Sequence, residues 1–217
     1  VSCRAWASQH PKAQKRDPIS VDDVMSSRAI ADPLKILDCS LVSDGGAAVV
    51  ITRKDRAKGG PHKPVTLLGY GEGHAYEHIS QAKDLTTSAA AQSGHAAYTE
   101  AGFTPDDIDL LQLYDCFTPA LLIQIEDLGF CGKGEGGAWL ASGISRPGGS
   151  KPMNTHGGML SYCHPGNPGA MFGLTEAITQ MRGDAGDRQL PNMRTALCHA
   201  QGGIMSSHAT VILGVEA

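Results

Sequence analysis

IDLLQLYDCFTPALLIQIEDL, residues 108–128, contains the pattern that decides the fold. Its first seven residues, 108–114, are apolar enough to form a buried strand. Residues 119–128 then predict an amphipathic helix, because their apolar side chains recur on one face: Leu121, Leu122, Ile125 and Leu128. A strand that leads through a short polar turn into a helix is the repeating unit of α/β folds.

The same rhythm of strand, turn and helix continues on both sides of this stretch. Further strands are predicted at residues 65–70, 195–199 and 208–213. Further helices are predicted at residues 88–101, which Gly102 would end, and at residues 167–182, where the apolar side chains at helical spacing are Met171, Leu174, Ile178 and Met181. This alternation predicts a sheet covered by helices, in which ligands bind at the carboxyl ends of the strands.

The first 63 residues have a different character. Residues 1–38 are polar and irregular, and we expect a loop region there with one short helix at 21–31. Residues 43–46 (SDGG) predict a turn, and residues 47–52 (AAVVIT) predict a strand buried on both faces. A basic, mobile segment at 53–63 closes with Gly59-Gly60-Pro61, which suggests a domain boundary. We therefore divide the chain into a loop region (1–38), a strand with a linker (39–63) and a main domain (64–217).

Composition excludes several classes of protein. The 217 residues contain 18 Lys plus Arg against 22 Asp plus Glu, a net charge of -4 that argues against nucleic acid as a partner. No stretch approaches the roughly 20 apolar residues of a membrane span. The sequence starts at Val1 without Met or a signal-like segment, and we expect it to be part of a longer chain.

Cysteine and histidine usage points to a cytoplasmic protein without a metal centre. The six cysteines form no CxxC pair, which favours reduced, mostly buried thiols. The nine histidines are scattered, and none forms a helical i, i+4 pair beside a carboxylate. We therefore expect no bound metal.

Three motifs fall at predicted strand exits: residues 114–119 (YDCFTP), residues 154–166 (NTHGGMLSYCHPG) and residues 198–203 (CHAQGG). Together they supply the Tyr, Asp, Cys and His side chains that proton transfer and covalent catalysis use. Each residue also has a structural interpretation, since a tyrosine can simply bury its ring, His164 can be a turn residue and the cysteines can be packed. A site is favoured because all three motifs would meet at one sheet edge.

Residues 39–217 resemble the C-terminal half of the thiolase superfamily, in particular the lipid-transfer-protein or sterol-carrier-protein branch. Residues 114–117 stand where that family has Asn-Glu-Ala-Phe or His-Asp-Cys-Phe, and residues 154–166 are similar to its Gly-Gly and Gly-His-Pro-x-Gly block. Residues 199–203 stand where it has Cys-x-Gly-Gly-Gly, and residues 43–48 resemble the strand that closes its N-terminal domain.

The resemblance implies an α/β thiolase fold of two βαβαβαββ halves in five α/β/α/β/α layers, usually dimeric, of which this chain is mainly the second half. It also implies that the nucleophilic cysteine of the family belongs to the first half. None of the six cysteines here falls in the motif of that nucleophile. Acyl-enzyme chemistry therefore cannot be predicted from these residues.

Departures from the family pattern carry the functional hypothesis. His164 matches the histidine that activates the nucleophile, whereas Tyr114 and His199 replace the usual residues at two other positions. Tyrosines at 114 and 162 resemble the thiolase-like retro-aldolases of steroid side-chain degradation. A tyrosinate base needs a nearby cation or hydrogen-bond donor, such as His164 or His199, because its ordinary pKa is about 10.

The leading hypothesis is retro-aldol cleavage of a β-hydroxyacyl-CoA from a steroid or lipid side chain. Tyr162 is predicted as the base, Tyr114 as an acid or a hydrogen-bonding group, and His164 with His199 as holders of the thioester oxygen. Asp115 is predicted to orient its neighbours. The expected substrate-binding positions are Asn154, His156, Gly157, Gly158, Gly202 and Gly203.

Two other functions stay open. One is an acyl-transferring thiolase, an acetyl-CoA acyltransferase, and the other is a non-catalytic subunit that binds lipid or stabilises an assembly. The resemblance implies no bound cofactor, with coenzyme A present only as part of the acyl-CoA substrate. It further implies a homodimer and a partner protein with an OB-fold and a zinc ribbon.

Overall fold

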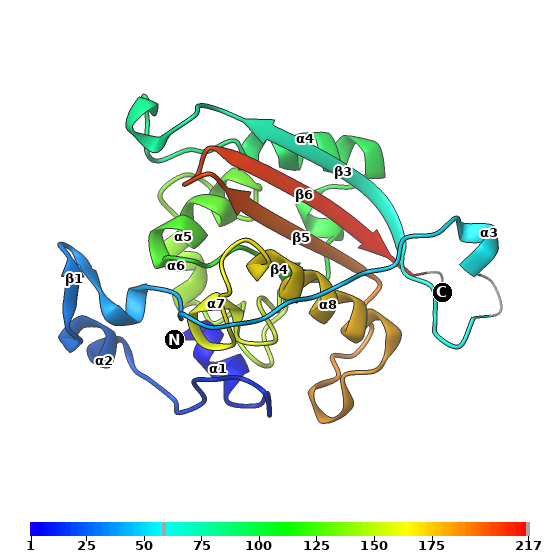
Figure 1. The fold of residues 1–217 in the computed structure, drawn as a ribbon, viewed down its shortest axis with the longest axis horizontal. Helices are drawn as coiled ribbons and strands as arrows, with labels where there is room; N and C mark the ends of the chain where they lie inside the picture. Colours follow the sequence, from blue (N-terminus) through cyan, green and yellow to red (C-terminus); the bar gives the residue numbers. More distant parts are fainter. Residues whose placement is uncertain (58–59, 216–217) are drawn as a thin grey trace.

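A computed structural model describes residues 1–57 and 60–215 and contains one central four-stranded sheet. Its strands are β3 (Thr66–His74), β6 (Ser207–Gly214), β5 (Thr195–Gly202) and β4 (Leu110–Gln112), in that spatial order. β6 is antiparallel to both neighbours, and β4 is parallel to β5. The carboxyl ends of β3, β5 and β4 therefore share one edge of the sheet (Figure 1).

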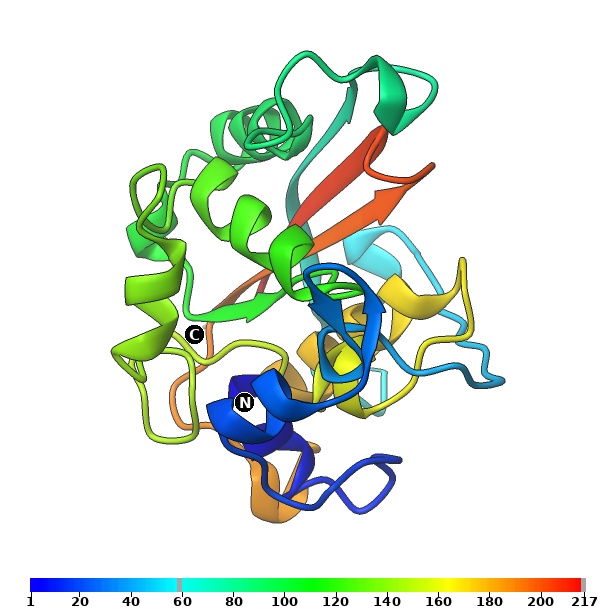
Figure 2. The same cartoon turned by 90° about the vertical axis from the view of Figure 1, so that its left-hand side faces the viewer.

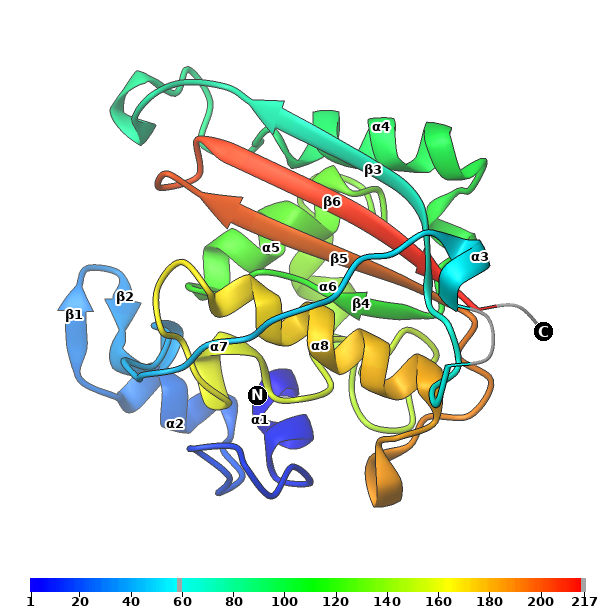
Figure 3. The ribbon, with the colours of Figure 1, turned by 45° about the vertical axis from the view of Figure 1, so that its right-hand side comes forward.

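Helices cover both faces of this sheet, as predicted. α4 (Ala90–Ala101) and α5 (Thr118–Asp127) lie on one face and α8 (Gly169–Arg182) lies on the other (Figure 3). Two groups of buried side chains fill the interfaces: Leu111, Leu121, Ile125, Leu197 and Ile212 on the α5 side, and Leu110, Ala177, Met181, Ala196 and Leu213 on the α8 side. The four strands and three helices predicted for this part are confirmed, with ends shifted by a few residues.

The expected βαβαβαββ order contains one strand that is hardly formed. Met153 makes an isolated parallel bridge with Leu111, supported by hydrogen bonds from the Leu111 N–H to the Pro152 carbonyl (3.0 Å) and from the Asn154 N–H to the Leu111 carbonyl (2.9 Å). This bridge stands at the free edge of β4.

Close contact between α4 and β3 depends on glycine. A Cβ atom added at Gly69, Gly71 or Gly73 would lie 2.2–2.4 Å from a carbonyl oxygen at the N-terminus of α4 or within the helix. Alternate residues of a strand face the same side, so these three glycines form one flat stripe. The helix face above it carries the small buried residues Ala90, Ser93 and Ala97.

The expectation of an irregular loop over residues 1–38 is wrong in its first part. α1 (Ser2–Ala7) is a packed helix, and Trp6 is buried and donates its indole N–H to the Ser145 carbonyl at 2.8 Å. This helix lies beneath the sheet, as Figure 2 shows. The sequence lacked an apolar period because the helix has only six residues.

The predicted helix at 21–31 ends early. α2 (Val21–Ser26) has a capping box between Ser20 and Asp23, and Ser27 then takes an extended conformation. Two short strands, β1 (Ala29–Ala31) and β2 (Leu34–Lys35), form a small antiparallel pair instead. Pro33 between them disfavours a helical conformation at the residue before it.

The prediction of a buried strand at residues 47–52 is also wrong. The chain from 41 to 53 is extended without strand pairing and crosses α7 (Gly158–Ser161) and α8 (Figures 1 and 3). Val50 and Ile51 are 95% and 87% exposed. No strand within the described residues runs beside this segment, so its backbone has no ladder to join.

The remaining elements are short. They are α3 (Lys54–Ala57), α6 (Gly136–Ala141) and four 3₁₀ turns: η1 (Ile36–Asp38), η2 (Ile79–Gln81), η3 (Pro105–Asp107) and η4 (Gly186–Arg188). The predicted boundary at Gly59-Gly60-Pro61 falls partly outside the described residues, and the division into three domains stays a prediction. Among the described residues, no helix combines the length and apolar character needed to cross a membrane.

Candidate active site

Tyr114 and His164 meet at the sheet edge where the first two motifs converge. Tyr114 follows β4, and His164 stands in the loop between α7 and α8. The Tyr114 hydroxyl oxygen is 2.9 Å from His164 Nε2, and the two rings are nearly perpendicular with centroids 5.7 Å apart. The structure thus forms a hydrogen-bonded acid–base pair from two separate motifs.

Burial keeps both members of this pair uncharged near neutral pH. Loss of solvent raises the pKa of Tyr114 to about 12, helped by the nearby Cys116 and Asp115. Loss of solvent also lowers the pKa of His164. A neutral imidazole beside a neutral phenol can accept the phenolic proton, so this contact can act as a proton relay.

Ser40 completes the relay, although nothing in the sequence indicated it. Its hydroxyl oxygen lies 3.1 Å from His164 Nδ1, on the far side of the ring from Tyr114. In the tautomer with its proton on Nδ1, His164 donates to Ser40 and accepts from Tyr114. A single serine beside Cys39 has no distinguishing pattern, and only the extended path of the chain brings it here.

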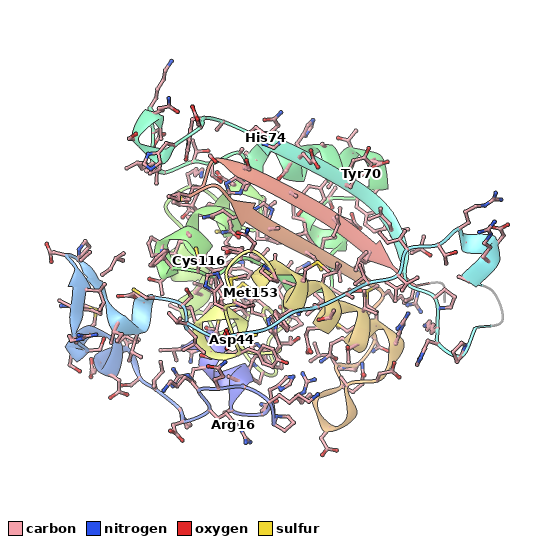
Figure 4. All side chains as sticks on the ribbon, in the orientation of Figure 1. Arg16, Asp44, Tyr70, His74, Cys116 and Met153 are labelled. Atoms are coloured by element: carbon pink, nitrogen blue, oxygen red, sulfur yellow. The ribbon has the colours of Figure 1, made fainter. Side chains whose placement is uncertain are left out.

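Backbone hydrogen bonds hold the Ser40 segment between the first and second motifs. The Ser40 N–H donates to the Cys116 carbonyl at 2.8 Å, and the Leu41 N–H donates to the Met159 carbonyl at 3.0 Å. The His164 N–H in turn donates to the Ser43 hydroxyl at 2.8 Å. The segment therefore fixes the position of His164 at the sheet edge. Asp44 and Cys116, which lie near it, are labelled in Figure 4.

Asp115 contacts the backbone of α7. It is fully buried and its carboxylate accepts hydrogen bonds from the N–H groups of Met159 (2.7 Å) and Leu160 (3.4 Å). A Cβ at Gly158 would lie 2.0 Å from this carboxylate, so glycine is required there. Desolvation raises the pKa of Asp115. These contacts tie Asp115 to the backbone of α7, and its role in orienting its neighbours stays a prediction.

The structure gives Asn154, Gly157 and Gly158 contacts within the protein, and their role in substrate binding stays a prediction. Asn154 is fully buried, and its amide accepts from the Leu113 N–H (2.8 Å) and donates to the Leu113 carbonyl (3.0 Å). Gly157 has φ +112° and packs against Ala7. These residues shape the loop, and a ligand would have to displace protein to reach them.

The third motif needs a correction as well. β5 continues to Gly202, and Gly202 and Gly203 are exposed where the chain turns into β6. Both ring nitrogens of His199 are occupied: Nδ1 by the Thr210 hydroxyl (2.8 Å) and Nε2 by His208 Nδ1 (2.9 Å). Burial lowers the pKa of His199 to about 3. This ring has no free nitrogen with which to hold a thioester oxygen.

Tyr162 stands two residues before His164 but contacts a different set of rings. Its ring packs edge-on against His10 (4.8 Å between centroids) and His156 (5.2 Å), and it is tilted against Phe172 (5.8 Å). Burial raises the pKa of Tyr162. The cation or donor that would make it a base was expected from His164 or His199, and neither ring contacts it among the described hydrogen bonds and ring pairs.

Gln124, which the sequence did not single out, clamps the backbone of Tyr114. Its fully buried amide accepts from the Tyr114 N–H (3.0 Å) and donates to the Tyr114 carbonyl (2.8 Å). The same amide nitrogen also donates to Gln201 of the third motif at 3.1 Å. The third motif thus reaches the site through Gln201 rather than through His199.

The cysteines near the site are thiols rather than thiolates. Burial raises the pKa of Cys116 and Cys198 to about 12 and that of Cys163 to about 11. Nucleophilic catalysis requires the thiolate, so these three are poor nucleophiles. Within residues 1–57 and 60–215, no group of three or more His, Cys, Asp or Glu side chains has the arrangement of a metal site.

The fold, together with a site formed by the loop after β4 and the loop between α7 and α8, is that of a thiolase C-terminal domain. The model of the family described as "Thiolase C-terminal domain-like" matches residues 71–215, and the chain belongs to the thiolase family. Within the family it falls in the branch of the sterol-carrier-protein thiolases and the steroid side-chain aldolases.

Individual relatives agree with this placement. The chain is 36% identical to an acetyl-CoA acetyltransferase of Methanothermobacter thermautotrophicus, over 91% of this chain and 52% of the relative. It is 38% identical to a 17-hydroxy-3-oxo-4-pregnene-20-carboxyl-CoA lyase of Mycobacterium tuberculosis, over 84% of this chain and 48% of the relative.

A solved structure of an Ltp2-ChsH2(DUF35) aldolase superposes with a TM-score of 0.90 at 35% identity. The match covers 99% of this chain and 56% of that one. The chain thus spans about half the length of the curated relatives it matches.

Proposed function

We propose that this chain provides the acid–base half of an enzyme that cleaves a β-hydroxyacyl-CoA by a retro-aldol reaction. The contact that carries the proposal is the 2.9 Å hydrogen bond between Tyr114 and His164. The chain is similar to a 17-hydroxy-3-oxo-4-pregnene-20-carboxyl-CoA lyase. The substrate in that name is a CoA ester with a hydroxyl group, which supports the reaction class.

The proton relay accounts for the one proton that a retro-aldol cleavage moves. Tyr114 takes the β-hydroxyl proton as its own proton passes to His164, and the hydroxyl-bearing carbon becomes a carbonyl. The Cα–Cβ bond breaks, and its electron pair stays on the thioester as an enolate. The proton held by His164 returns through Tyr114 to Cα, so the net change is transfer of one proton from oxygen to carbon.

This assignment differs from the one expected from the sequence, in which Tyr162 is the base. Tyr114 has the hydrogen-bonded histidine that a phenolic base needs, and Tyr162 packs against His10 and His156 instead. His164 becomes the proton acceptor rather than a holder of the thioester oxygen. We propose no catalytic role for His199.

Acyl transfer is the second candidate, favoured by the similarity to an acetyltransferase. It requires a nucleophilic thiolate, and burial keeps Cys116, Cys163 and Cys198 protonated. In that case His164 would activate a cysteine outside the described residues.

A partner and a homodimer also belong to the proposal. The neighbour with a TM-score of 0.90 is named as a two-component aldolase, which supports a partner protein for this chain. An OB-fold with a zinc ribbon, a cytoplasmic location and substrates from steroid or lipid side chains are part of the same proposal. Coenzyme A would enter only as part of the substrate.

One assay separates the candidates. The protein, with its partner co-expressed, is given a β-hydroxyacyl-CoA and, separately, a β-ketoacyl-CoA with free CoA. Cleavage of the hydroxy ester that is lost in Tyr114→Phe and kept in Tyr162→Phe supports the proposal. Thiolysis of the keto ester without cleavage of the hydroxy ester would replace it by acyl transfer.

A further inference from the structure

A cavity of about 520 Å³ is lined by residues of the second motif and by neither Tyr114 nor His164. We call it the histidine pocket, and its polar lining includes His10, Lys12, Arg16, His156, Tyr162 and Arg188. The proposed reaction uses none of these residues.

Two histidines of the lining, His10 and His156, each have a ring nitrogen without a protein partner. His10 accepts a hydrogen bond from the Lys12 N–H at Nδ1 (3.1 Å), so in its neutral form it carries its proton on Nε2, for which the described residues offer no acceptor. His156 is 5% exposed, and its Nδ1 is buried without any partner. A buried polar atom without a partner is costly, and a ligand atom is one way to satisfy it.

Cations outnumber carboxylates in the lining of the pocket, which carries Lys12, Arg16 and Arg188 against Glu176 and Asp187. Arg188 is paired with the buried Glu176 at 2.7 Å, whose carboxylate also accepts from Thr155 and Gln180. Lys12 and Arg16 make no ion pair with a carboxylate among the described residues. With Arg188 and Glu176 paired to each other, two cations stand against Asp187, and this excess of positive charge suits an oxyanion.

The two cations stand on a fixed segment rather than on a free loop. The Gln14 N–H donates to the Tyr162 carbonyl (3.3 Å) and the Lys15 N–H to the Ser161 carbonyl (3.0 Å). Arg4 holds the end of the segment through the Asp17 carbonyl at 2.9 Å. Arg16 is labelled in Figure 4 on this segment.

We propose that the histidine pocket binds the phosphate group of a small organic molecule, with Lys12 and Arg16 as its charge partners. The cavity is much larger than a phosphate ion, so the ligand carries a further organic part that packs against Tyr162 and Phe172. The phosphate can belong to a nucleotide such as the CoA portion of the substrate, or to a separate metabolite. The site does not depend on the proposed reaction.

Calorimetric titration tests this proposal without any turnover. The probes are inorganic phosphate, ADP and CoA, each titrated into wild type, Lys12→Gln, Arg16→Gln and His156→Phe, with the melting temperature as a check of folding. Loss of one charge partner should weaken ADP binding about three- to tenfold. Lys15→Gln is the matched control, because Lys15 is exposed on the same segment and does not line the pocket.

Each outcome decides something. If the variants weaken CoA as well as ADP, the phosphate is that of the substrate, and if they weaken ADP or inorganic phosphate alone, the ligand is a separate metabolite. Both results support the site. Absence of binding by all three probes at millimolar concentration, or equal binding by wild type and the Lys12 and Arg16 variants, would overturn it.

Discussion

The Tyr114 hydroxyl oxygen lies 2.9 Å from His164 Nε2, although 50 positions separate the two residues in the chain. The contact exists because β4 and the α7–α8 loop end at the same sheet edge, and because Asp115 and Ser43 hold that loop in place. A hydrogen bond between two weakly solvated, ionisable side chains is typical of an acid–base site.

Removal of the phenolic oxygen should stop catalysis without unfolding the protein. Tyr114→Phe is expected to lower kcat for β-hydroxyacyl-CoA cleavage by about 10²- to 10⁴-fold, the usual contribution of a positioned acid–base group. Tyr70→Phe is the matched control, since Tyr70 is 57% exposed on β3. A Tyr114→Phe enzyme within threefold of wild type would remove Tyr114 from the mechanism.

The pH profile should reflect the two shifted groups. His164 must be neutral to accept a proton, and burial lowers its pKa, so activity should fall only when the pH drops below the ordinary histidine value of about 6.5. Tyr114 must be protonated at the start of the relay, and its pKa of about 12 keeps the alkaline side flat through pH 9. A kcat/KM profile with an acid limb above pH 7 would contradict this assignment.

Ser40 should shift the acid limb of the same pH profile. Its hydroxyl can accept a hydrogen bond from His164 Nδ1–H, and this bond stabilises the imidazolium. Ser40→Ala is therefore expected to lower the pKa of His164 further, move the acid limb to lower pH and reduce kcat by about tenfold. Ser80→Ala, at an exposed position far along the chain, serves as the control. An unchanged acid limb in Ser40→Ala would show that the contact is structural.

How much of this was predictable depends on whether a residue lies in a regular element. The apolar periods of residues 108–114 and 119–128 predicted β4 and α5, because strand and helix periods are local properties. The order of the motifs predicted that they meet at one edge, as β4 parallel to β5 requires.

Side-chain directions in the irregular loops were not predictable. Tyr162 and His164 stand two positions apart with no repeating period between them, and their side chains contact different partners, His10 and Tyr114. Residues 47–52 failed for another reason: their apolar pattern describes a strand, but strand pairing is a tertiary property that needs a neighbour. His199 matched a family position, yet its neighbours Thr210 and His208 took both nitrogens.

Acid should destabilise the fold through its buried histidines. His199 has a pKa of about 3 in the folded state against about 6.5 when unfolded, so the unfolded state binds more protons below pH 6.5. The contribution of neutral His199 to the free energy of unfolding is fully present above pH 6.5 and is lost as the pH falls from 6.5 toward 3. The loss is about 1.4 kcal/mol per pH unit in the middle of this window. His199→Gln should therefore show a flatter dependence of melting temperature on pH than wild type or His62→Gln, whose ring is exposed.

The glycine stripe of β3 should tolerate no side chain. A Cβ at Gly71 would lie 2.2 Å from the Ser93 carbonyl oxygen and 2.7 Å from the Ala96 side chain, and the first of these is helix backbone that cannot rotate away. Gly71→Ala must therefore push α4 off the sheet, which opens the contact around Ala97 and Ile212 and costs about 2–4 kcal/mol. Gly46→Ala is the control, because nothing lies within 4 Å of its added Cβ. Urea unfolding should show a lower midpoint for Gly71→Ala alone; equal midpoints for the two variants would mean that α4 can move away from β3 at little cost.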